Sequence, residues 1–394
     1  MSDYLFFFGR TPKLAWGELL TFFPNATQFL EHLAIVTKQE FEAKGLTPID
    51  WVQKLGGVVK IATIAASVPS VTPEAVASVV AGELQGKRLT FGVSTGEGDQ
   101  PVTRRFLEET KSILQLQGHR VRFVESRHGS VLSSVVITKN DLIDVTIVKD
   151  QGKFLLAHTV AVQDFESWNR RDYGRPYADP KSGMLPPKVA RMAVNIALGF
   201  QKRLNPVSLQ GLTLTGSKVL LDPFCGMGTI VGEALLTGWN IVGSDQSNDV
   251  VEKARQNLEW LEGSHPSRKD AILPTVKFFV SDATHVSEHL KPESVDAIVT
   301  EPYMGPTVGG NDKFQMTNDK IKNIIKGLEK LYIGCLRDWQ KILKPGGKVI
   351  IALPEYRIED KMFFVKKVID RCENLGYTKL HGPIEYSRPQ AIVR

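Results

Sequence analysis

The residues best suited to chemistry lie near the middle of the chain, in Leu221–Thr229, which reads LDPFCGMGT. This segment follows a continuous apolar run, Lys218–Leu221, and precedes a helical pattern over about 229–237. Two glycines in such a turn let the backbone bend tightly and approach a bound molecule without a Cβ clash. Open parallel sheets bind ligands at this edge, so the segment is a candidate binding loop. It differs from the dinucleotide pattern GxGxxG because an acid, Asp222, precedes the glycines.

Two more acids follow the next two predicted strands. Asp245 closes the strand predicted over 240–244, and Asp282 follows the strand predicted over 276–280. A carboxylate after the second strand can accept hydrogen bonds from both hydroxyls of a ribose. Asp222 suits the positively charged amino-acid end of S-adenosylmethionine, and Asp282 is placed to accept the adenine amino group.

A single aspartate after a strand is more often a helix cap or a turn former than a ligand. Three acids after three successive strands, beside a turn with two glycines, are harder to explain as structure alone. We therefore expect a site for S-adenosylmethionine. Its predicted residues are Asp222, Phe224, Gly226, Gly228, Thr229, Asp245, Gln246, Asp282 and Ala283. Cys225 lies within the loop with no base beside it, so we interpret it as a packing residue.

The fourth predicted strand ends in Glu301-Pro302-Tyr303-Met304, and this end is the candidate reaction site. Methyltransferases that act on exocyclic amino groups usually carry Asp or Asn, two prolines and an aromatic residue here. An aryl amine is a poor nucleophile, and oxygens that accept its N–H bonds orient the lone pair without a strong base. Glu301 and the Pro302 carbonyl would be these acceptors, with Tyr303 stacking on the extruded base. The other interpretation is a turn that ends the strand.

The order of elements predicts two architectures. From residue 218 onward strands and helices alternate, with a helix over about 317–343, a strand over 347–352 and a helix over about 359–375, which predicts an open, mostly parallel sheet. The first 165 residues mix both types, with a predicted strand at Val135–Ile137. Residues 166–190 are rich in Pro, Gly and Arg and lack apolar periodicity, so we expect a linker there.

Composition and charge set further limits. The chain has 394 residues, a net charge of +6 and three cysteines that lie far apart, with no CxxC pattern for zinc. Residues 101–200 hold 15 Lys and Arg against 10 Asp and Glu, which fits either phosphate binding or a solvated surface. No apolar run reaches the length of about 18 residues that a membrane span needs. We expect a cytoplasmic protein, without a metal or a membrane partner.

Four segments resemble the THUMP-domain tRNA guanine-N2 methyltransferases, the group that modifies the guanosine at position ten, within the class I methyltransferases. They are Tyr4–Leu20, Arg171–Pro176, Ser182–Lys188 and Asp222–Thr229. The resemblance spans nearly the full chain. It departs from the family at the reaction site, where relatives carry Asp-Pro-Pro-Tyr and this chain has Glu301-Pro302-Tyr303-Met304.

The resemblance implies an α/β protein with three parts. Residues 1–165 would form ferredoxin-like and THUMP domains that bind RNA, 166–190 a linker, and 191–394 a Rossmann-like methyltransferase domain on a mostly parallel seven-stranded sheet. It implies tRNA as substrate, and some relatives need a small activator subunit. Leu185 and Pro186 would pack near the cofactor. The candidate phosphate contacts are Arg120, Arg122, Arg127, Arg170, Arg171, Arg175 and Lys188.

Two other functions remain open from the residues. A DNA adenine-N6 or protein-glutamine methyltransferase would share the amino-methylation pattern. The N-terminal half argues against both, because it resembles an RNA-binding module. A non-catalytic tRNA-binding protein that keeps the cofactor fold is the third reading, and the altered Glu301 segment would be its symptom. Cofactor binding without methyl transfer would favour that reading.

Overall fold

The computed structural model describes residues 3–83, 89–96, 102–126, 132–179, 184–199, 218–263, 274–306, 317–358, 361–380 and 384. The chain divides into two compact units, Met1–Glu166 and Ser167–Arg394. The predicted RNA contact Arg127, and Ser182 and Gly183 of the Ser182–Lys188 segment, lie outside the described residues.

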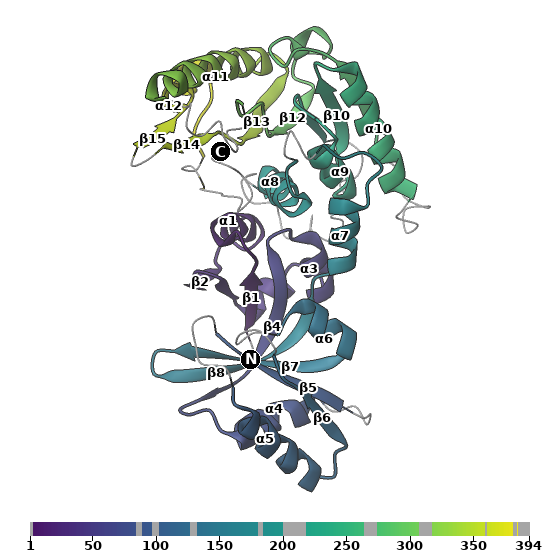
Figure 1. The fold of residues 1–394 in the computed structure, drawn as a ribbon, viewed down its shortest axis with the longest axis vertical. Coiled ribbons are helices and arrows are strands. Elements are labelled where there is room, and N and C mark those ends of the chain that lie inside the picture. Colours follow the sequence, from purple (N-terminus) through teal and green to yellow (C-terminus); the bar gives the residue numbers. More distant parts are fainter. Residues whose placement is uncertain are drawn as a thin grey trace. The chain divides into compact units, whose positions relative to one another are not determined.

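One eight-stranded sheet runs through the first unit, in the order β2-β3-β1-β4-β8-β7-β5-β6 (Figure 1). Its β5 pairs in parallel with β6 and β7, and the other neighbours are antiparallel. The strands are β1 (Tyr4–Phe8), β2 (Thr27–Leu30), β3 (Leu33–Val36), β4 (Val58–Val68), β5 (Leu89–Thr95), β6 (Val121–Val124), β7 (Leu142–Asp150) and β8 (Lys153–Val162). The helices are α1 (Pro12–Phe22), α2 (Lys38–Glu42), α3 (Pro48–Lys54), α4 (Pro73–Gly82), α5 (Arg104–Leu116) and α6 (Ser134–Asn140).

Side chains at the helix starts of this unit fix where each helix begins. The Thr47 hydroxyl accepts from the Asp50 amide while the Asp50 carboxylate accepts from the Thr47 amide, which is a complete capping box. Thr72 caps α4 in a similar way, with Pro73 in the first turn. Pro73 could therefore be recognised from the sequence as a helix start.

A buried ion pair crosses the centre of the sheet. Lys60 of β4 and Asp144 of β7 lie 2.8 Å apart, with 5% and 0% of their side chains exposed. The Asp144 carboxylate also accepts from Ser94 and Thr159, and Lys60 donates to Thr146. Every group in this network has partners, so the sheet accommodates the two charges at little net cost.

Five parallel strands form the sheet of the second unit, in the order β11-β10-β9-β12-β13. Chain order reverses direction between β9 and β12, the point at which such folds bind ligands. The strands are β9 (Val219–Asp222), β10 (Asn240–Asp245), β11 (Val276–Val280), β12 (Val295–Thr300) and β13 (Leu343–Ile351), followed by the hairpin β14 (Glu355–Ile358) and β15 (Lys361–Phe364). The helices are α7 (Phe165–Tyr173), which begins at the boundary, α8 (Pro187–Gly199), α9 (Thr229–Leu236), α10 (Asn248–Gly263), α11 (Asn318–Trp339) and α12 (Lys366–Arg371).

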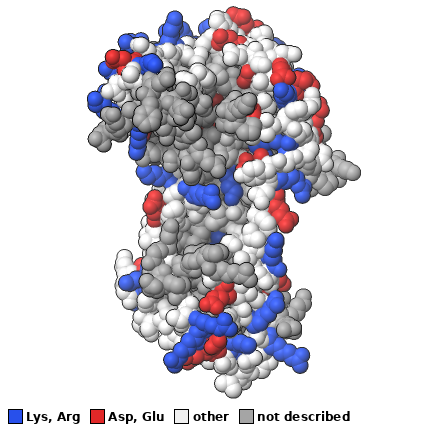
Figure 2. Space-filling view, viewed as in Figure 1, with Lys and Arg blue, Asp and Glu red and all other residues white. Residues whose placement is uncertain are grey.

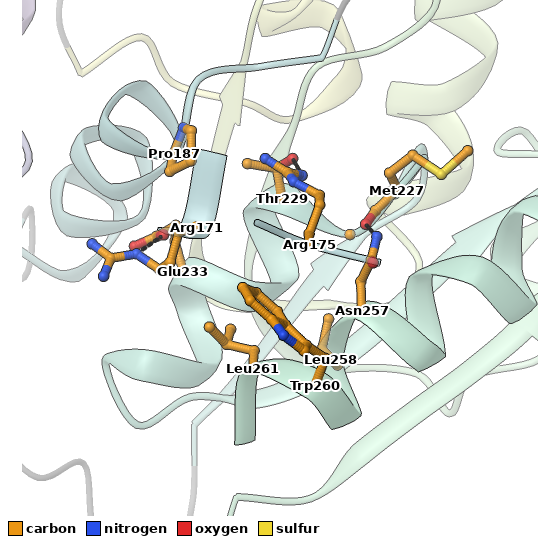
Figure 3. A pocket seen from close by; sticks show the side chains of 12 residues that line it. Arg171, Arg175, Pro187, Met227, Thr229, Glu233, Asn257, Leu258, Trp260 and Leu261 are labelled. Atoms are coloured by element: carbon orange, nitrogen blue, oxygen red, sulfur yellow. Dashed lines mark hydrogen bonds and ion pairs between the residues drawn. The ribbon is translucent and has the colours of Figure 1, made fainter. Parts of the chain in front are cut away.

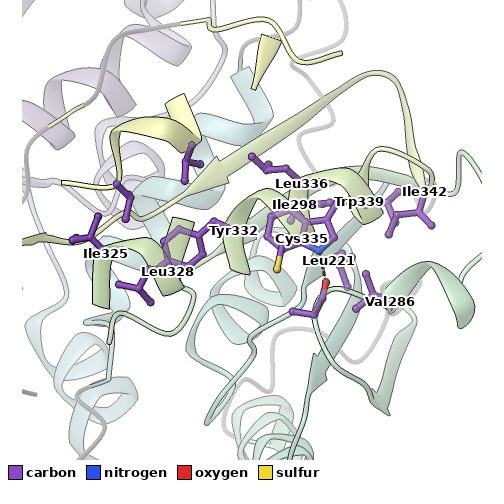
Figure 4. Packing of buried hydrophobic residues seen from close by; sticks show 14 of the residues in the cluster. Leu221, Val286, Ile298, Ile325, Leu328, Tyr332, Cys335, Leu336, Trp339 and Ile342 are labelled. Atoms are coloured by element: carbon purple, nitrogen blue, oxygen red, sulfur yellow. Dashed lines mark hydrogen bonds between the residues drawn. The ribbon is translucent and has the colours of Figure 1, made fainter. Parts of the chain in front are cut away.

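The core of this unit lies between α11 and the strands (Figure 4). Tyr332 and Trp339 of α11 are fully buried against Leu221 of β9 and Ile298 of β12. The Trp339 indole Nε1 donates to the Ala283 carbonyl at 2.9 Å, so the helix is also tied to the segment after β11. This packing fixes the strand ends that carry the predicted site.

The α/β fold class is confirmed, but three local predictions are wrong. Residues 135–137 lie in α6 and not in a strand, because Ser133 caps a helix there and its hydroxyl accepts from the Val136 amide. The helix expected over 359–375 is replaced by β15 and the short α12, since Phe363 and Phe364 pack on the core beside β14. Residues 166–173 belong to α7 and are not a linker without regular structure.

Two further findings concern the described residues only. The described residues contribute five strands to the parallel sheet, where the resemblance predicts seven. Among them, no helix combines the length and the hydropathy that a bilayer crossing requires.

Candidate functional site

Parallel pairing brings the predicted acids to one edge of the sheet. Asp222 at the end of β9 is level with Gly243 of β10, and Asp245 at the end of β10 is level with Val280 of β11. The Ser281 amide then donates to the Asp245 carbonyl at 3.0 Å. Asp222 and Asp245 therefore end neighbouring strands, and Asp282 follows the third.

The glycine turn after β9 is anchored to β10. The Cys225 amide donates to the Ser244 carbonyl at 2.9 Å, and the Gly226 amide donates to Asp245 Oδ2 at 3.3 Å. Gly226 has φ +49° and Gly228 has φ +85°, a region that favours glycine. Cys225 is 4% exposed, and burial raises the pKa of its thiol well above the usual value. Its protonated, buried thiol agrees with a packing role.

Asp222 is the most perturbed acid at this edge. It is 1% exposed, and burial raises its pKa to about 7. Hydrogen bonds from the Thr300 hydroxyl, at 2.7 Å, and from the Phe224 amide lower the pKa but do not offset burial. The charges of Asp245 and Glu301 raise it further, which places both acids within electrostatic reach. A cation at this point would be strongly stabilised.

The other predicted cofactor residues lie around the same edge. Asp245 Oδ1 accepts from the Ser247 amide at 3.1 Å, and Gln246 beside it is exposed. Asp282 is exposed, and its Oδ1 accepts from the Thr284 amide and hydroxyl, which lower its pKa. Those bonds are typical of a turn former, so the structure leaves the adenine role of Asp282 as a prediction.

Glu301 follows β12, which pairs with β9, so the predicted reaction site adjoins the acid edge. Pro302 is buried, Glu301 is half-buried, and the Tyr303 ring is 57% exposed. An exposed ring after a buried proline is available to stack on a planar substrate. The geometry thus provides a carboxylate and an aromatic face beside the acid edge.

Two tyrosines that the sequence did not single out contact this segment. The Tyr332 hydroxyl of α11 donates to the Tyr303 carbonyl at 2.6 Å. The Tyr356 hydroxyl of β14 donates to the Met304 carbonyl. They lie 29 and 52 residues away in sequence, so spacing alone gave no signal.

The segment after α7 packs on the helix side of the glycine turn (Figure 3). The Asn257 side chain of α10 donates to the carbonyls of both Tyr177 and Met227 at 2.9 Å. Its Oδ1 accepts from the Tyr177 amide at 2.9 Å. Arg175 donates to the Thr229 hydroxyl at 2.7 Å. The segment that contains Arg175 and Tyr177 therefore contacts the turn directly through Arg175, and is linked to it a second time through Asn257 of α10.

A small pocket, open to solvent, borders these contacts (Figure 3). Arg175, Met227 and Asn257 are among its lining residues. None of the described residues that line it is one of the four strand-end acids. The only carboxylate among the described residues that line the pocket is Glu233, which already forms ion pairs with Arg171 and Arg191. We therefore place the candidate reaction chemistry at the edge of the sheet where the acids follow the strands.

Glu233 of α9 is the centre of a buried ion cluster. Its carboxylate lies 2.8 Å from Arg171 Nε and 2.6 Å from an Arg191 guanidinium nitrogen, and its own side chain is 3% exposed. The Arg171 guanidinium also stacks on the Trp168 ring at 4.0 Å. This cluster joins α7, α8 and α9.

The prediction that Arg171 and Arg175 contact tRNA phosphates is therefore corrected. Their side chains are 10% and 5% exposed and bond within the unit, so they hold the connecting segment in place. Burial lowers the Arg175 pKa, while Asp172 and Glu233 raise it.

The structure places the remaining predicted RNA contacts in both units. Arg120, Arg122 and Arg170 are exposed, and Arg122 also donates to the Thr90 hydroxyl at 2.7 Å. Lys188 is half-buried, with its ammonium 5.6 Å from the centre of the Trp168 ring. Figure 2 shows basic and acidic side chains intermixed over the described surface of the first unit. Their contacts with RNA stay a prediction.

Leu185 and Pro186 precede α8. Leu185 is 8% exposed, and the Pro186 carbonyl accepts from the Val189 amide at 2.9 Å, which starts the helix. Their expected place beside the cofactor also stays a prediction. In the described residues, no group of three or more His, Cys, Asp or Glu is arranged to hold a metal ion.

Comparison with known proteins adds four findings. The chain is 27% identical over 267 residues to tRNA (guanine(10)-N2)-dimethyltransferase of Pyrococcus abyssi, which covers 64% of this chain and 70% of that protein. It is 32% identical over 242 residues to the protein of the same name from Methanothermobacter thermautotrophicus, covering 60% and 59%. The chain thus spans less than two thirds of the second relative. The crystal structure of TrmN from Thermus thermophilus aligns over 89% of this chain and 88% of that chain, with 17% identity and a TM-score of 0.46.

The fourth finding concerns the second unit alone. Residues 214–387 match the family model described as a methyltransferase domain. This range contains the five parallel strands, the glycine turn and all four strand-end acids. The chain therefore contains a methyltransferase domain, built on an α/β fold with a parallel sheet.

Proposed function

We propose that this protein methylates the exocyclic N2 amino group of a guanosine in tRNA, at position ten, using S-adenosylmethionine. The observation that carries the proposal is the single edge at which Asp222, Asp245 and Glu301 end neighbouring strands. The names of the relatives from Pyrococcus abyssi and Methanothermobacter thermautotrophicus support the substrate.

The residues at this edge fit the cofactor. The ammonium group at the amino-acid end of the cofactor would favour the ionised form of the buried Asp222 carboxyl and so oppose the rise in its pKa. Asp245 accepts amide bonds from Gly226 and Ser247, and a carboxylate has further lone pairs for two ribose hydroxyls. When bound, S-adenosylmethionine supplies a methyl group on a positively charged sulfur. Asp282 would accept the adenine amino group.

The residues after β12 would then orient the acceptor. The Glu301 carboxylate and the Pro302 carbonyl accept the N–H bonds of the guanine amino group, which points its lone pair toward the methyl group. The half-exposed Tyr303 ring stacks on the extruded base. The N–C bond would form as the methyl–sulfur bond breaks and its electron pair returns to sulfur. The amino nitrogen would then release one proton to Glu301 or to water, so Glu301 need not be a strong base.

The first unit would hold the tRNA. Its proposed role follows from the resemblance to THUMP-domain enzymes, in which that module grips the acceptor end. Arg120, which precedes the edge strand β6, and Arg122 within it would contact phosphates, with Arg170 and Lys188 in the second unit. Phosphate contacts position the substrate and carry no sequence information, so the target base is selected at the strand end.

Nucleoside mass spectrometry tests this proposal. Purified full-length protein is incubated with S-adenosylmethionine and either an unmodified tRNA transcript or the same transcript with adenosine at position ten. We expect N2-methylated guanosine only in the first, and the masses count the methyl groups added. Duplex DNA and a glutamine-containing peptide serve as parallel substrates.

Three results would contradict the proposal. Methylation of adenine in the DNA or of the peptide would assign a different substrate. Methylation of both transcripts would exclude position ten. No product, despite measured binding of cofactor and tRNA, would favour a tRNA-binding protein, provided that addition of a cell extract as a source of an activator subunit also yields none.

A further inference from the structure

Two buried tyrosine hydroxyls meet the backbone directly after Glu301. Tyr332 of α11 is fully buried, and its hydroxyl donates to the Tyr303 carbonyl at 2.6 Å. Tyr356 of β14 is 1% exposed, and its hydroxyl donates to the Met304 carbonyl. Two consecutive carbonyls are thus held by donors from two different elements, which fixes the orientation of both peptide planes.

The next residue completes this arrangement. Gly305 has φ +88°, a conformation that other residues rarely adopt. A Cβ atom built on Gly305 would overlap the Tyr356 hydroxyl. The turn therefore accepts the tyrosine only because residue 305 lacks a side chain, and the two features require each other.

The surroundings of the hydroxyls keep them as donors. Burial raises the pKa of Tyr332, and nearby Tyr356, Cys335, Tyr303 and Glu301 raise it further. Both rings lie in the apolar cluster that contains Leu328 and Ile325 of α11 (Figure 4). A hydrogen bond in such surroundings is stronger than in water and is costly to leave unmade.

We propose that Tyr332 and Tyr356 are positioning residues of the reaction site. Their hydroxyls fix the backbone from Tyr303 to Gly305, and so aim the Glu301 carboxylate, the Pro302 carbonyl and the Tyr303 ring at one acceptor group. The inference rests on the proposed function, because it assigns these tyrosines to that same site. Reaction rates are sensitive to such aim, since a misplacement of about 1 Å can cost roughly 100-fold.

The experiment removes one oxygen atom at a time. Tyr332→Phe and Tyr356→Phe keep the buried rings and lose only the hydroxyl bonds. Tyr377→Phe is the matched control, because its hydroxyl donates to the Leu336 carbonyl of α11 at 2.7 Å, in the same unit but not at the strand end. For each full-length variant we would measure Tm, Kd for S-adenosylmethionine, and kcat and KM with the tRNA transcript.

We expect a split between chemistry and binding. In Tyr332→Phe and Tyr356→Phe, kcat should fall by about tenfold or more, while KM for tRNA and Kd for the cofactor change by less than about twofold. In Tyr377→Phe, Tm should fall by a similar amount, but kcat should stay near the wild-type value. A purely structural role predicts equal changes in all three variants.

Equal kcat in the three variants would overturn the inference, and so would a loss of cofactor affinity parallel to the loss of kcat. A wild-type protein that stays inactive even when the cell extract is added would instead refute the proposed function, so the two failures are distinguishable. If either tyrosine variant does not fold, Gly305→Ala probes the same contact from the other side. It should lower kcat and leave cofactor Kd unchanged, and full activity there would contradict the inference.

Discussion

Among the single residues, Asp222 is the one whose burial in the fold most strongly opposes the charge that its proposed role requires. The fold buries its carboxyl completely, and only the Thr300 hydroxyl and the Phe224 amide favour its charged form. A folded pKa of about 7, against an ordinary value of 3.8, means that ionisation opposes folding. Stability from this group is therefore lost as pH rises from about 4 to about 7.

We predict that cofactor binding offsets the unfavourable ionisation of the buried Asp222 carboxyl. Because a cationic ligand favours the carboxylate, affinity of the wild-type protein for S-adenosylmethionine should rise as pH increases through about 7. Asp222→Asn should bind the cofactor weakly at every pH and should gain Tm relative to wild type as pH rises. Thermal melts from about pH 4 to about pH 8 would measure the Tm difference, and titration calorimetry from about pH 6 to about pH 8 would measure the cofactor affinity.

Asp249→Asn provides the control, because Asp249 is an exposed acid of α10 whose side chain is 72% accessible. It should leave the pH profile of cofactor binding unchanged. A flat profile in the wild-type protein would contradict the role of Asp222.

At the scale of elements, α10 joins the connecting segment to the glycine turn through one amide. Asn257 is 6% exposed and bonds to the carbonyls of Tyr177 and Met227. We predict that Asn257→Ala lowers affinity for S-adenosylmethionine by about tenfold, because two partly buried carbonyls lose their donor and the turn loosens. Gln256→Ala, which removes an exposed side chain from the same helix, should bind normally. Calorimetry that finds the two variants alike would disprove the link.

The sequence predicted the elements whose signal is local and repeated. The apolar runs of β9, β10, β11 and β12, with an acid or turn after each, placed the acid edge correctly because parallel strands align their ends. Residues 135–137 misled because three β-branched or apolar residues fit a strand, whereas the Ser133 cap and the packing of Ile137 favour a helix.

Contacts across long stretches of sequence could not be predicted in this way. The Tyr332 and Tyr356 hydroxyls reach the reaction segment only because α11 and β14 pack there. Likewise, Arg171 appeared in a basic, Pro- and Gly-rich stretch that is typical of an exposed linker. Its burial depends on Glu233, 62 residues later, which no spacing rule connects to it.

For the whole molecule, we propose that different residues bind tRNA and carry out methyl transfer. We predict that Arg120→Ala combined with Arg122→Ala raises KM for tRNA and reduces the salt dependence of binding by about two phosphate charges, with kcat and cofactor Kd unchanged. Arg105→Ala, which removes an exposed arginine already paired with Glu109, is the control. Filter binding over a range of salt concentrations would measure the slope. Identical slopes for the double variant and the wild type would show that these arginines do not contact tRNA phosphates.

The central claim is that chemistry occurs at Glu301 while the acids of the neighbouring strands hold the cofactor. The most direct measurement is single-turnover methylation of an unmodified tRNA transcript by wild type, Glu301→Ala and Glu301→Gln, with cofactor Kd determined for each. We expect Glu301→Ala to bind the cofactor like wild type but to form almost no N2-methylguanosine. Glu301→Gln keeps an oxygen acceptor and should retain part of the rate. Full activity of Glu301→Ala would contradict the account, because the reaction would then take place elsewhere.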